Sequence, residues 1–185
     1  KDVMATLAYA ATLAPSVIMS YWNPIEKYGV SKFASDMAAA GGSGTITPDL
    51  TLEEAGPWLA ACKEHGLNPI FVIAPSSNDD RLQRVVKSCG GFVYAASIMG
   101  VTGARASVSD AAQTLVERAR NYTDLPISVG LGVSTPEQAE GVAKYANGVI
   151  VGSAFINAVA KAPDFESGLK AVTKLASELK AGISK

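Results

Sequence analysis

The sequence predicts a single α/β domain, spanning residues 1–185, in which short strands alternate with helices. Three observations lead to this prediction. Short apolar runs rich in Val and Ile recur along the chain without alternating polar residues, as is typical of strands covered on both faces. A turn and a stretch of helical spacing follow these runs. Repeated strand–helix units build a parallel sheet through right-handed crossovers.

Six of the apolar runs are expected to be strands. They are residues 16–21 (SVIMSY), 44–48 (GTITP), 69–75 (PIFVIAP), 91–97 (GFVYAAS), 126–132 (PISVGLG) and 148–153 (GVIVGS). Six strands are compatible with an open doubly wound sheet or with part of a (βα)8 barrel, which closes with eight strands. If the runs are strands three to eight of such a barrel, two strand–helix units are missing upstream of the first run.

Helices are expected in the intervening stretches and at the N-terminus. These stretches are residues 1–17, 50–67, 77–91, 107–122 and 134–140. In 50–67 one face is apolar, as a packed helix requires, and consists of Leu52, Ala55, Leu59 and Cys62. In 134–140 (STPEQAE), Thr135 is the expected N-cap, Pro136 the first helical residue, and Gln138 closes a capping box.

Composition and charge exclude several classes of protein. The net charge is −1 at pH 7 and no basic stripe appears, which argues against nucleic-acid binding. No apolar run reaches the length of a membrane span, and the N-terminal segment lacks the continuous apolar core of a signal peptide. The two cysteines, Cys62 and Cys89, fit neither a disulfide framework nor a metal-binding spacing. We therefore expect a reduced, cytoplasmic protein without a metal site.

Three glycine-rich turns follow successive expected strands. They are residues 100–105 (GVTGAR), 130–134 (GLGVS) and the end of 148–153 (GVIVGS). Glycine lets main-chain N–H groups approach an anion closely, and helix N-termini favour negative charge. In barrels, the loops after strands seven and eight form a phosphate site with the N-terminus of a short helix. The turns therefore predict a shared phosphate site, and the plainer alternative is that glycine merely ends each strand.

Five longer stretches resemble a known family, the tryptophan synthase α subunit. They are residues 17–55, 69–77, 91–105, 130–140 and 148–159. The most specific combination is SIMGVTGAR followed by GLGVSTPEQ, and the resemblance extends from about residue 15 to the C-terminus. It implies a (βα)8 TIM barrel, seen here as a partial barrel with strands three to eight and their helices.

The resemblance also implies a function and a partner. The family is a lyase of tryptophan biosynthesis that cleaves indole-3-glycerol phosphate to indole and glyceraldehyde 3-phosphate. Indole then passes to a pyridoxal-phosphate β subunit in an α2β2 heterotetramer, and the α subunit carries no cofactor of its own.

Site residues carry over from the family by position and fall into four groups. The implied phosphate binders are Gly103, Gly132, Gly152 and Ser153. Supporting catalytic roles fall to Tyr94, facing the reacting part of the substrate, and to Thr102, a partner of the catalytic aspartate. The implied indole pocket consists of Met19, Tyr21, Ile46 and Leu131. The rim that faces the β subunit would include Asn23 and Pro24.

The general acid/base pair of the family is absent from this sequence. The family carries a Glu on the second strand and an Asp in the following loop, in a P[FY]SDP…DGPT motif, and neither motif occurs here. The resemblance thus implies that the chain starts in the helix before strand three. We expect the 185-residue chain alone to be inactive, because the reaction needs a proton donor and a proton acceptor.

Two other functions remain open from the sequence: a different phosphate-binding βα-barrel isomerase of amino-acid biosynthesis, and a non-catalytic binding fragment. Individual residues have alternatives too. Asp49, after the second strand, is either a catalytic acid or, as we favour, a cap of the turn and helix that follow. Trp22 is an interface residue or a loop anchor, and Tyr94 is a substrate contact or a core residue. His65 is expected on the surface at a helix C-terminus.

Overall fold

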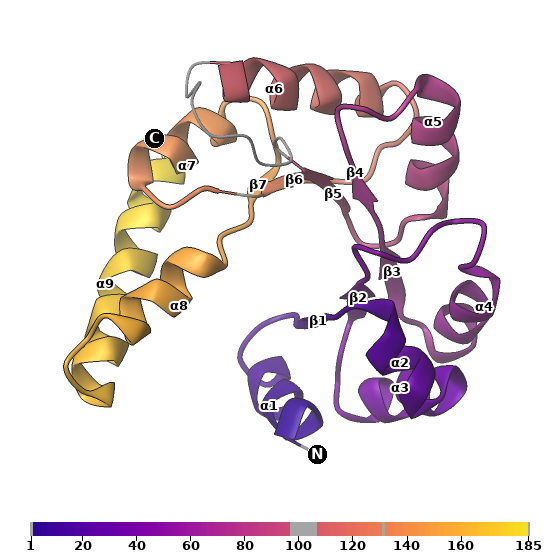
Figure 1. Ribbon diagram of the computed structural model, residues 1–185, viewed down its shortest axis with the longest axis horizontal. Coiled ribbons are helices and arrows are strands. Elements are labelled where there is room, and N and C mark those ends of the chain that lie inside the picture. The colour runs from indigo at the N-terminus through magenta and orange to yellow at the C-terminus, as the bar shows by residue number, and fades with distance from the viewer. Residues whose placement is uncertain (1, 97–106, 131, 185) are drawn as a thin grey trace. The chain divides into compact units, whose positions relative to one another are not determined.

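The computed structural model describes residues 2–96, 107–130 and 132–184 (Figure 1). The chain divides into two compact units. The first comprises Lys1–Ile73, Asn78–Val93 and Tyr122–Leu125, and the second comprises Ala74–Ser77, Tyr94–Asn121 and Pro126–Lys185. The single domain expected from the sequence stays a prediction.

A three-stranded parallel sheet organises the first unit. Its strands lie in the order β1 (Val17–Met19), β2 (Gly44–Ile46) and β3 (Asn68–Ile70), with Val17 opposite Gly44 and Gly44 opposite Asn68. The two-residue strand β4 (Val72–Ile73) follows directly. The prediction of one strand over 69–75 was therefore wrong. Phe71 between β3 and β4 is buried although it belongs to neither strand, so the apolar run reports burial and not continuous pairing.

Five helices belong to the first unit in the part of the chain that is described. They are α1 (Asp2–Ala11), α2 (Trp22–Tyr28), α3 (Val30–Ala39), α4 (Gly56–His65) and α5 (Asp79–Ser88). The α4 indole ring of Trp58 is fully buried, 6.0 Å from the ring of Phe33 on α3. The predicted start of α4 was too early, because residues 52–54 form turns and Pro57 stands in the first helical turn. Gly66 ends α4 in a left-handed conformation, with φ of 66°.

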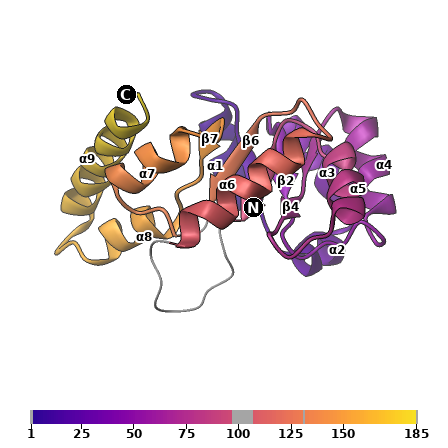
Figure 2. The ribbon, with the colours of Figure 1, turned by 90° about the horizontal axis from the view of Figure 1, so that it is seen from above.

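The second unit holds the remaining strands and helices. In chain order they are β5 (Val93–Ala96, of which Val93 belongs to the first unit), α6 (Ser107–Arg120), β6 (Ile127–Gly130), α7 (Pro136–Ala143), β7 (Gly148–Val149), α8 (Ser153–Ala160) and α9 (Phe165–Ile183). β5, β6 and β7 are neighbours in that order, and β6 and β7 are parallel with Ser128 opposite Gly148. Helices α7 and α9 lie side by side (Figure 2), where Gly182 lets α9 approach the carbonyl of Pro136.

The start of α7 confirms the capping box predicted from the sequence. The Thr135 hydroxyl accepts a hydrogen bond from the Gln138 main-chain N–H, and the Gln138 side-chain oxygen accepts from the Thr135 N–H. That oxygen also accepts from the N–H of Ser134. The amides of Ser134, Thr135 and Gln138 therefore all find acceptors within the helix start itself.

Removing this cap should measurably destabilise the chain. We expect Thr135→Ala to lower the free energy of unfolding by about 1 kcal/mol, because a helix amide loses its acceptor. Urea denaturation followed by circular dichroism measures the change. Thr135→Ser keeps the hydroxyl, and serine is as good an N-cap as threonine. The free energy of unfolding of this variant is therefore expected to stay within a few tenths of a kcal/mol of that of the parent chain. Equal destabilisation by both variants would contradict the role of the hydroxyl.

Candidate functional site

The carboxyl ends of β1 and β2 bring together two of the residues assigned to the indole pocket. Met19 lies opposite Ile46 in the sheet, and the N–H of Ser20 donates to the Ile46 carbonyl at 3.1 Å. Ile46 is buried, whereas Met19 is 57% exposed and Tyr21 is 69% exposed. The side chains of Met19 and Tyr21 are therefore accessible to a ligand, as the assignment to the indole pocket requires.

Directly after this strand end, Trp22 anchors the start of α2. The main-chain N–H of Trp22 donates to the carboxylate of Asp49, which follows β2, with 2.9 Å from the nitrogen to Oδ1 and 3.0 Å to Oδ2. Its half-buried ring meets the ring of Trp58 edge-on, with 6.2 Å between the centroids. Trp22 is thus a loop anchor. Asp49 is a cap, but the expected helix was wrong: it caps α2, which precedes it in sequence, and not the helix that follows.

The next two residues are the ones assigned to the partner-facing rim. Asn23 and Pro24 lie in the first turn of α2 and are both exposed. Ile25 behind them is buried, so the helix is held on one side while these two side chains face solvent. Their contact with a partner stays a prediction.

In the second unit, Tyr94 on β5 is buried beside the end of β6. A side chain at Gly130 would collide with the Tyr94 hydroxyl, and its Cβ would also come within 3.0 Å of Cβ of Ile150. Tyr94 is only 5% exposed, and burial raises the pKa of its phenol, so the hydroxyl is protonated at neutral pH. The structure therefore gives Tyr94 the burial of a core residue, with its hydroxyl reaching the main chain of β6.

Two of the predicted phosphate-binding turns follow the neighbouring strands β6 and β7. Gly132 comes after β6 in a left-handed conformation, with φ of 90°, and it is exposed. Gly152 and Ser153 come after β7, are both exposed, and begin α8. Since the two strands are parallel and paired, their following turns leave the sheet at the same edge.

The starts of α7 and α8 differ in a way that bears on anion binding. The α7 start is closed by its capping box, whereas α8 has no side-chain cap at Gly152. Uncapped N–H groups and the positive end of the helix dipole favour an anion. Ser153 and Gly152 are therefore better placed to bind a phosphate than the start of α7.

The structure does not describe all of the predicted site residues, and those that it describes are divided between the two units. Thr102, Gly103 and Leu131 lie outside the described residues. Of the others, Met19, Tyr21 and Ile46 belong to the first unit, and Tyr94, Gly132, Gly152 and Ser153 belong to the second.

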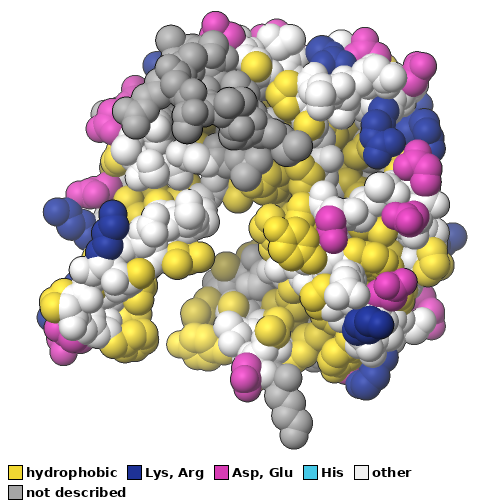
Figure 3. Space-filling model, in the orientation of Figure 1, with side chains coloured by type: hydrophobic (Ala, Val, Ile, Leu, Met, Phe, Trp, Pro, Cys, Tyr) yellow, Lys and Arg dark blue, Asp and Glu magenta, His cyan; other side chains and the backbone are white. Residues whose placement is uncertain are grey.

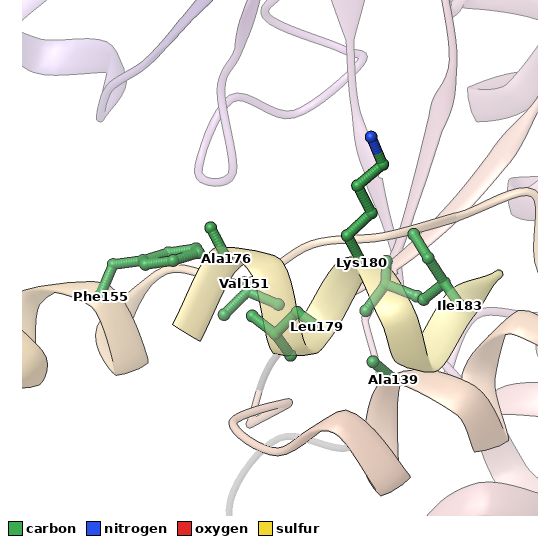
Figure 4. A pocket seen from close by; sticks show the side chains of 8 residues that line it. Ala139, Val151, Phe155, Ala176, Leu179, Lys180 and Ile183 are labelled. Atoms are coloured by element: carbon green, nitrogen blue, oxygen red, sulfur yellow. The ribbon is translucent and has the colours of Figure 1, made fainter. Parts of the chain in front are cut away.

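An apolar pocket that sequence reasoning missed lies within the second unit (Figure 4). Its volume is about 270 Å³, and its lining consists of Ala139, Val149, Val151, Phe155, Ala176, Leu179, Lys180 and Ile183. The Lys180 side chain extends away from the apolar side chains. Apolar side chains also remain on the surface of α8 and α9 (Figure 3), among them Ile156 and Phe165. None of the side chains that line this pocket carries a carboxyl or hydroxyl group.

Other chemistry-bearing groups lie in or directly after helices α4 and α5. Cys62 is buried in α4 and Cys89 follows α5, and burial raises the pKa of their thiols to about 12 and about 11. His65 lies in the last turn of α4, as expected. Within the described residues, no group of three His, Cys, Asp or Glu side chains could hold a metal ion. In the same residues no helix combines the length and the apolar character needed to cross a membrane.

Comparison with known proteins shows to which family the chain belongs. The model of one protein family, described as tryptophan synthase alpha chain, matches residues 2–184. The chain belongs to this family. A tryptophan synthase alpha chain from Acidothermus cellulolyticus is 57% identical over 182 residues, which cover 98% of this chain and 67% of the relative. The chain thus spans about two thirds of the length of this relative. A different barrel isomerase is not supported.

Solved structures of the family confirm the predicted fold class. A crystal structure of tryptophan synthase from M. tuberculosis matches with a TM-score of 0.88 and 45% identity, covering 100% of this chain and 68% of that chain. The tryptophan synthase α2β2 complex of Pyrococcus furiosus matches with a TM-score of 0.84 and 31% identity, covering 96% and 72%. The fold is the (βα)8 barrel of the tryptophan synthase α chains, of which this chain carries a part.

Proposed function

We propose that this chain supplies the substrate-binding part of a tryptophan synthase α subunit, the lyase that cleaves indole-3-glycerol phosphate. The observation that carries the proposal is the uncapped, exposed start of α8 beside the turn after β6. Main-chain N–H groups at Gly152 and Ser153, with the left-handed Gly132, would bind the phosphate of the substrate. Gly103 would join them from the turn after β5.

The indole end of the substrate would contact the exposed apolar side chains after β1 and β2. Met19 and Tyr21 offer accessible surface beside the buried Ile46. Leu131, which the resemblance assigns to the same pocket, lies outside the described residues. Burial of an aromatic ligand against such side chains contributes roughly 25 cal/mol per Å² of apolar surface.

Tyr94 would contribute a neutral hydroxyl near the reacting part of the substrate. Because its phenol pKa is raised, it can donate or accept a hydrogen bond but does not serve as a base at neutral pH. Thr102 would support a catalytic aspartate. The chain itself lacks the family's Glu and Asp motifs, so proton transfer to the indole ring would need groups from outside these residues.

The proposed partner is a tryptophan synthase β subunit in an α2β2 assembly. The complex from Pyrococcus furiosus supports this, since it is named as an α2β2 complex and resembles this chain. Asn23 and Pro24 at the exposed start of α2 would lie on the partner-facing rim. Pyridoxal phosphate would belong to the β subunit, the α chain would need no cofactor, and the assembly would be cytoplasmic.

A negative charge at the start of α8 tests the proposed phosphate site. Ser153→Asp is compatible with a helix start, where carboxylates are favourable, but it repels a phosphate. We expect binding of glyceraldehyde 3-phosphate to weaken at least about tenfold, equivalent to about 1.4 kcal/mol, while indole binding is unchanged. Titration calorimetry measures both ligands.

The matched control puts the same charge one turn further along the same helix. Asn157→Asp on α8 is exposed and should change phosphate-ester binding by less than about threefold, since dipole effects fade within one turn. An equal loss of phosphate-ester affinity in both variants would mean that the added negative charge acts by general repulsion. An unchanged affinity in Ser153→Asp would show that the phosphate does not bind at the start of α8.

A further inference from the structure

Asp49 is joined to α2 by a contact that neither the pocket nor the phosphate site uses. Its two carboxylate oxygens lie 2.9 and 3.0 Å from one donor, the N–H of Trp22. The N-cap residue Tyr21 supplies no side-chain cap of its own. The acceptor that satisfies the first amide of α2 therefore comes from 27 residues further along the chain.

This contact extends the pairing of β1 and β2 beyond the sheet. Met19 lies opposite Ile46, the Ser20 N–H donates to the Ile46 carbonyl, and the Trp22 N–H then donates to Asp49. The main chain of residues 20–22 is thus held to residues 46–49 at two successive points. Its course is determined by β2 and the loop after it.

The residues on either side of the anchored one are those that are exposed. Trp22 is half-buried against Trp58, whereas Tyr21, Asn23 and Pro24 are exposed. An anchored residue between exposed neighbours presents them in one arrangement before any partner arrives. Such preorganisation lowers the entropy cost of association.

We propose that Asp49 is a positioning residue for partner binding: through the Trp22 N–H it holds the exposed side chains at the start of α2 in the arrangement that the β subunit contacts. The inference rests on the proposed function for the identity of the partner. The hold on Trp22 itself depends only on the geometry of the chain.

Three variants of the 185-residue chain test the proposal. Asp49→Ala removes the acceptor, and Asp49→Asn keeps a neutral, weaker one. Asn78→Ala is the matched control: Asn78 is an exposed cap in the same unit, which accepts from the Arg81 N–H at 2.9 Å and starts α5. Both alanine variants lose one helix cap, so they should lose similar stability.

Two measurements separate positioning from stability. Hydrogen exchange reports the amides of Trp22, Asn23 and Ile25, since Pro24 has no N–H, and calorimetry reports affinity for the purified β subunit of the M. tuberculosis tryptophan synthase. For Asp49→Ala we expect about tenfold faster exchange and about tenfold weaker binding, the loss of one charge-assisted hydrogen bond. Asp49→Asn should lose about threefold in each, since neutral acceptors are weaker, and Asn78→Ala should leave both within about twofold.

The proposal is overturned if exchange at Trp22, Asn23 and Ile25 is unchanged in Asp49→Ala, or if Asn78→Ala weakens β-subunit binding as much. It is also overturned if exchange rises without any loss of affinity. If Asp49→Ala does not fold, Asp49→Asn decides, and an Asp49→Asn chain that behaves as the parent contradicts the proposal. A parent chain that binds no β subunit contradicts the proposed partner, while exchange at Trp22 still decides whether Asp49 holds the segment.

Discussion

The purified 185-residue chain is expected to release indole from indole-3-glycerol phosphate at least about 10⁴-fold more slowly than a full-length family member. The reason is the absence of two proton-transferring groups, each of which contributes about 10²-fold or more. The sequence lacks both motifs that carry the family's Glu and Asp. The nearest alternatives are unsuitable, because Asp49 accepts the Trp22 N–H and the buried Tyr94 phenol is protonated.

A turnover assay with the alpha chain of Acidothermus cellulolyticus as the reference measures the difference. Retained binding of indole and of glyceraldehyde 3-phosphate by the same preparation would show that the chain is folded and lacks only the proton-transferring groups. Indole release at a rate comparable to the reference would overturn the assignment of the proton transfers to groups outside these residues.

A methyl group at Gly130 is expected to destabilise the second unit severely. In Gly130→Ala the new Cβ would collide with the Tyr94 hydroxyl and lie 2.7 Å from the ring carbon that bears it. Tyr94 is only 5% exposed, and the new methyl group would compete with its hydroxyl for the same buried space, so we expect a loss of about 2–3 kcal/mol of unfolding free energy, typical of an overpacked core. Urea denaturation measures the loss.

A second substitution distinguishes this collision from a general effect of replacing glycine. Shortening the side chain in Gly130→Ala/Tyr94→Leu should recover at least about half of the lost stability, because the colliding atoms are removed. The matched control is Gly141→Ala in α7, where a Cβ would meet nothing within 4 Å and alanine should stabilise the helix by up to about 1 kcal/mol. A double variant no more stable than Gly130→Ala would rule out Tyr94 as the cause.

Features set by neighbouring residues could be predicted from the sequence, and features set by distant ones could not. The capping box of Thr135 and the end of α4 at Gly66 depend on residues within one turn, and both are confirmed. The six strand regions also follow from apolar runs. The break at Phe71 did not, because burial and strand pairing give the same apolar pattern.

The candidate site shows the same division. The glycine turns after β6 and β7 and the helix at Ser153 could be predicted, since they follow from local composition. Met19, Ile46 and Tyr94 were singled out only by the resemblance to the family, and their roles stay predictions. The hydrogen bond from the main-chain N–H of Trp22 to Asp49 could not be predicted from neighbouring residues, since only the pairing of β1 with β2 brings the two residues together.

The open start of α8 has a consequence for how the proposed site would respond to acidity. Main-chain amides neither gain nor lose a proton over the range in which proteins are stable. A site built from them presents the same partial positive charge in acid and in alkali. The phosphate monoester itself ionises, with a second pKa of about 6, so its affinity for the site would change with pH around that value. The electrostatic contribution of the protein's main-chain amides would stay constant.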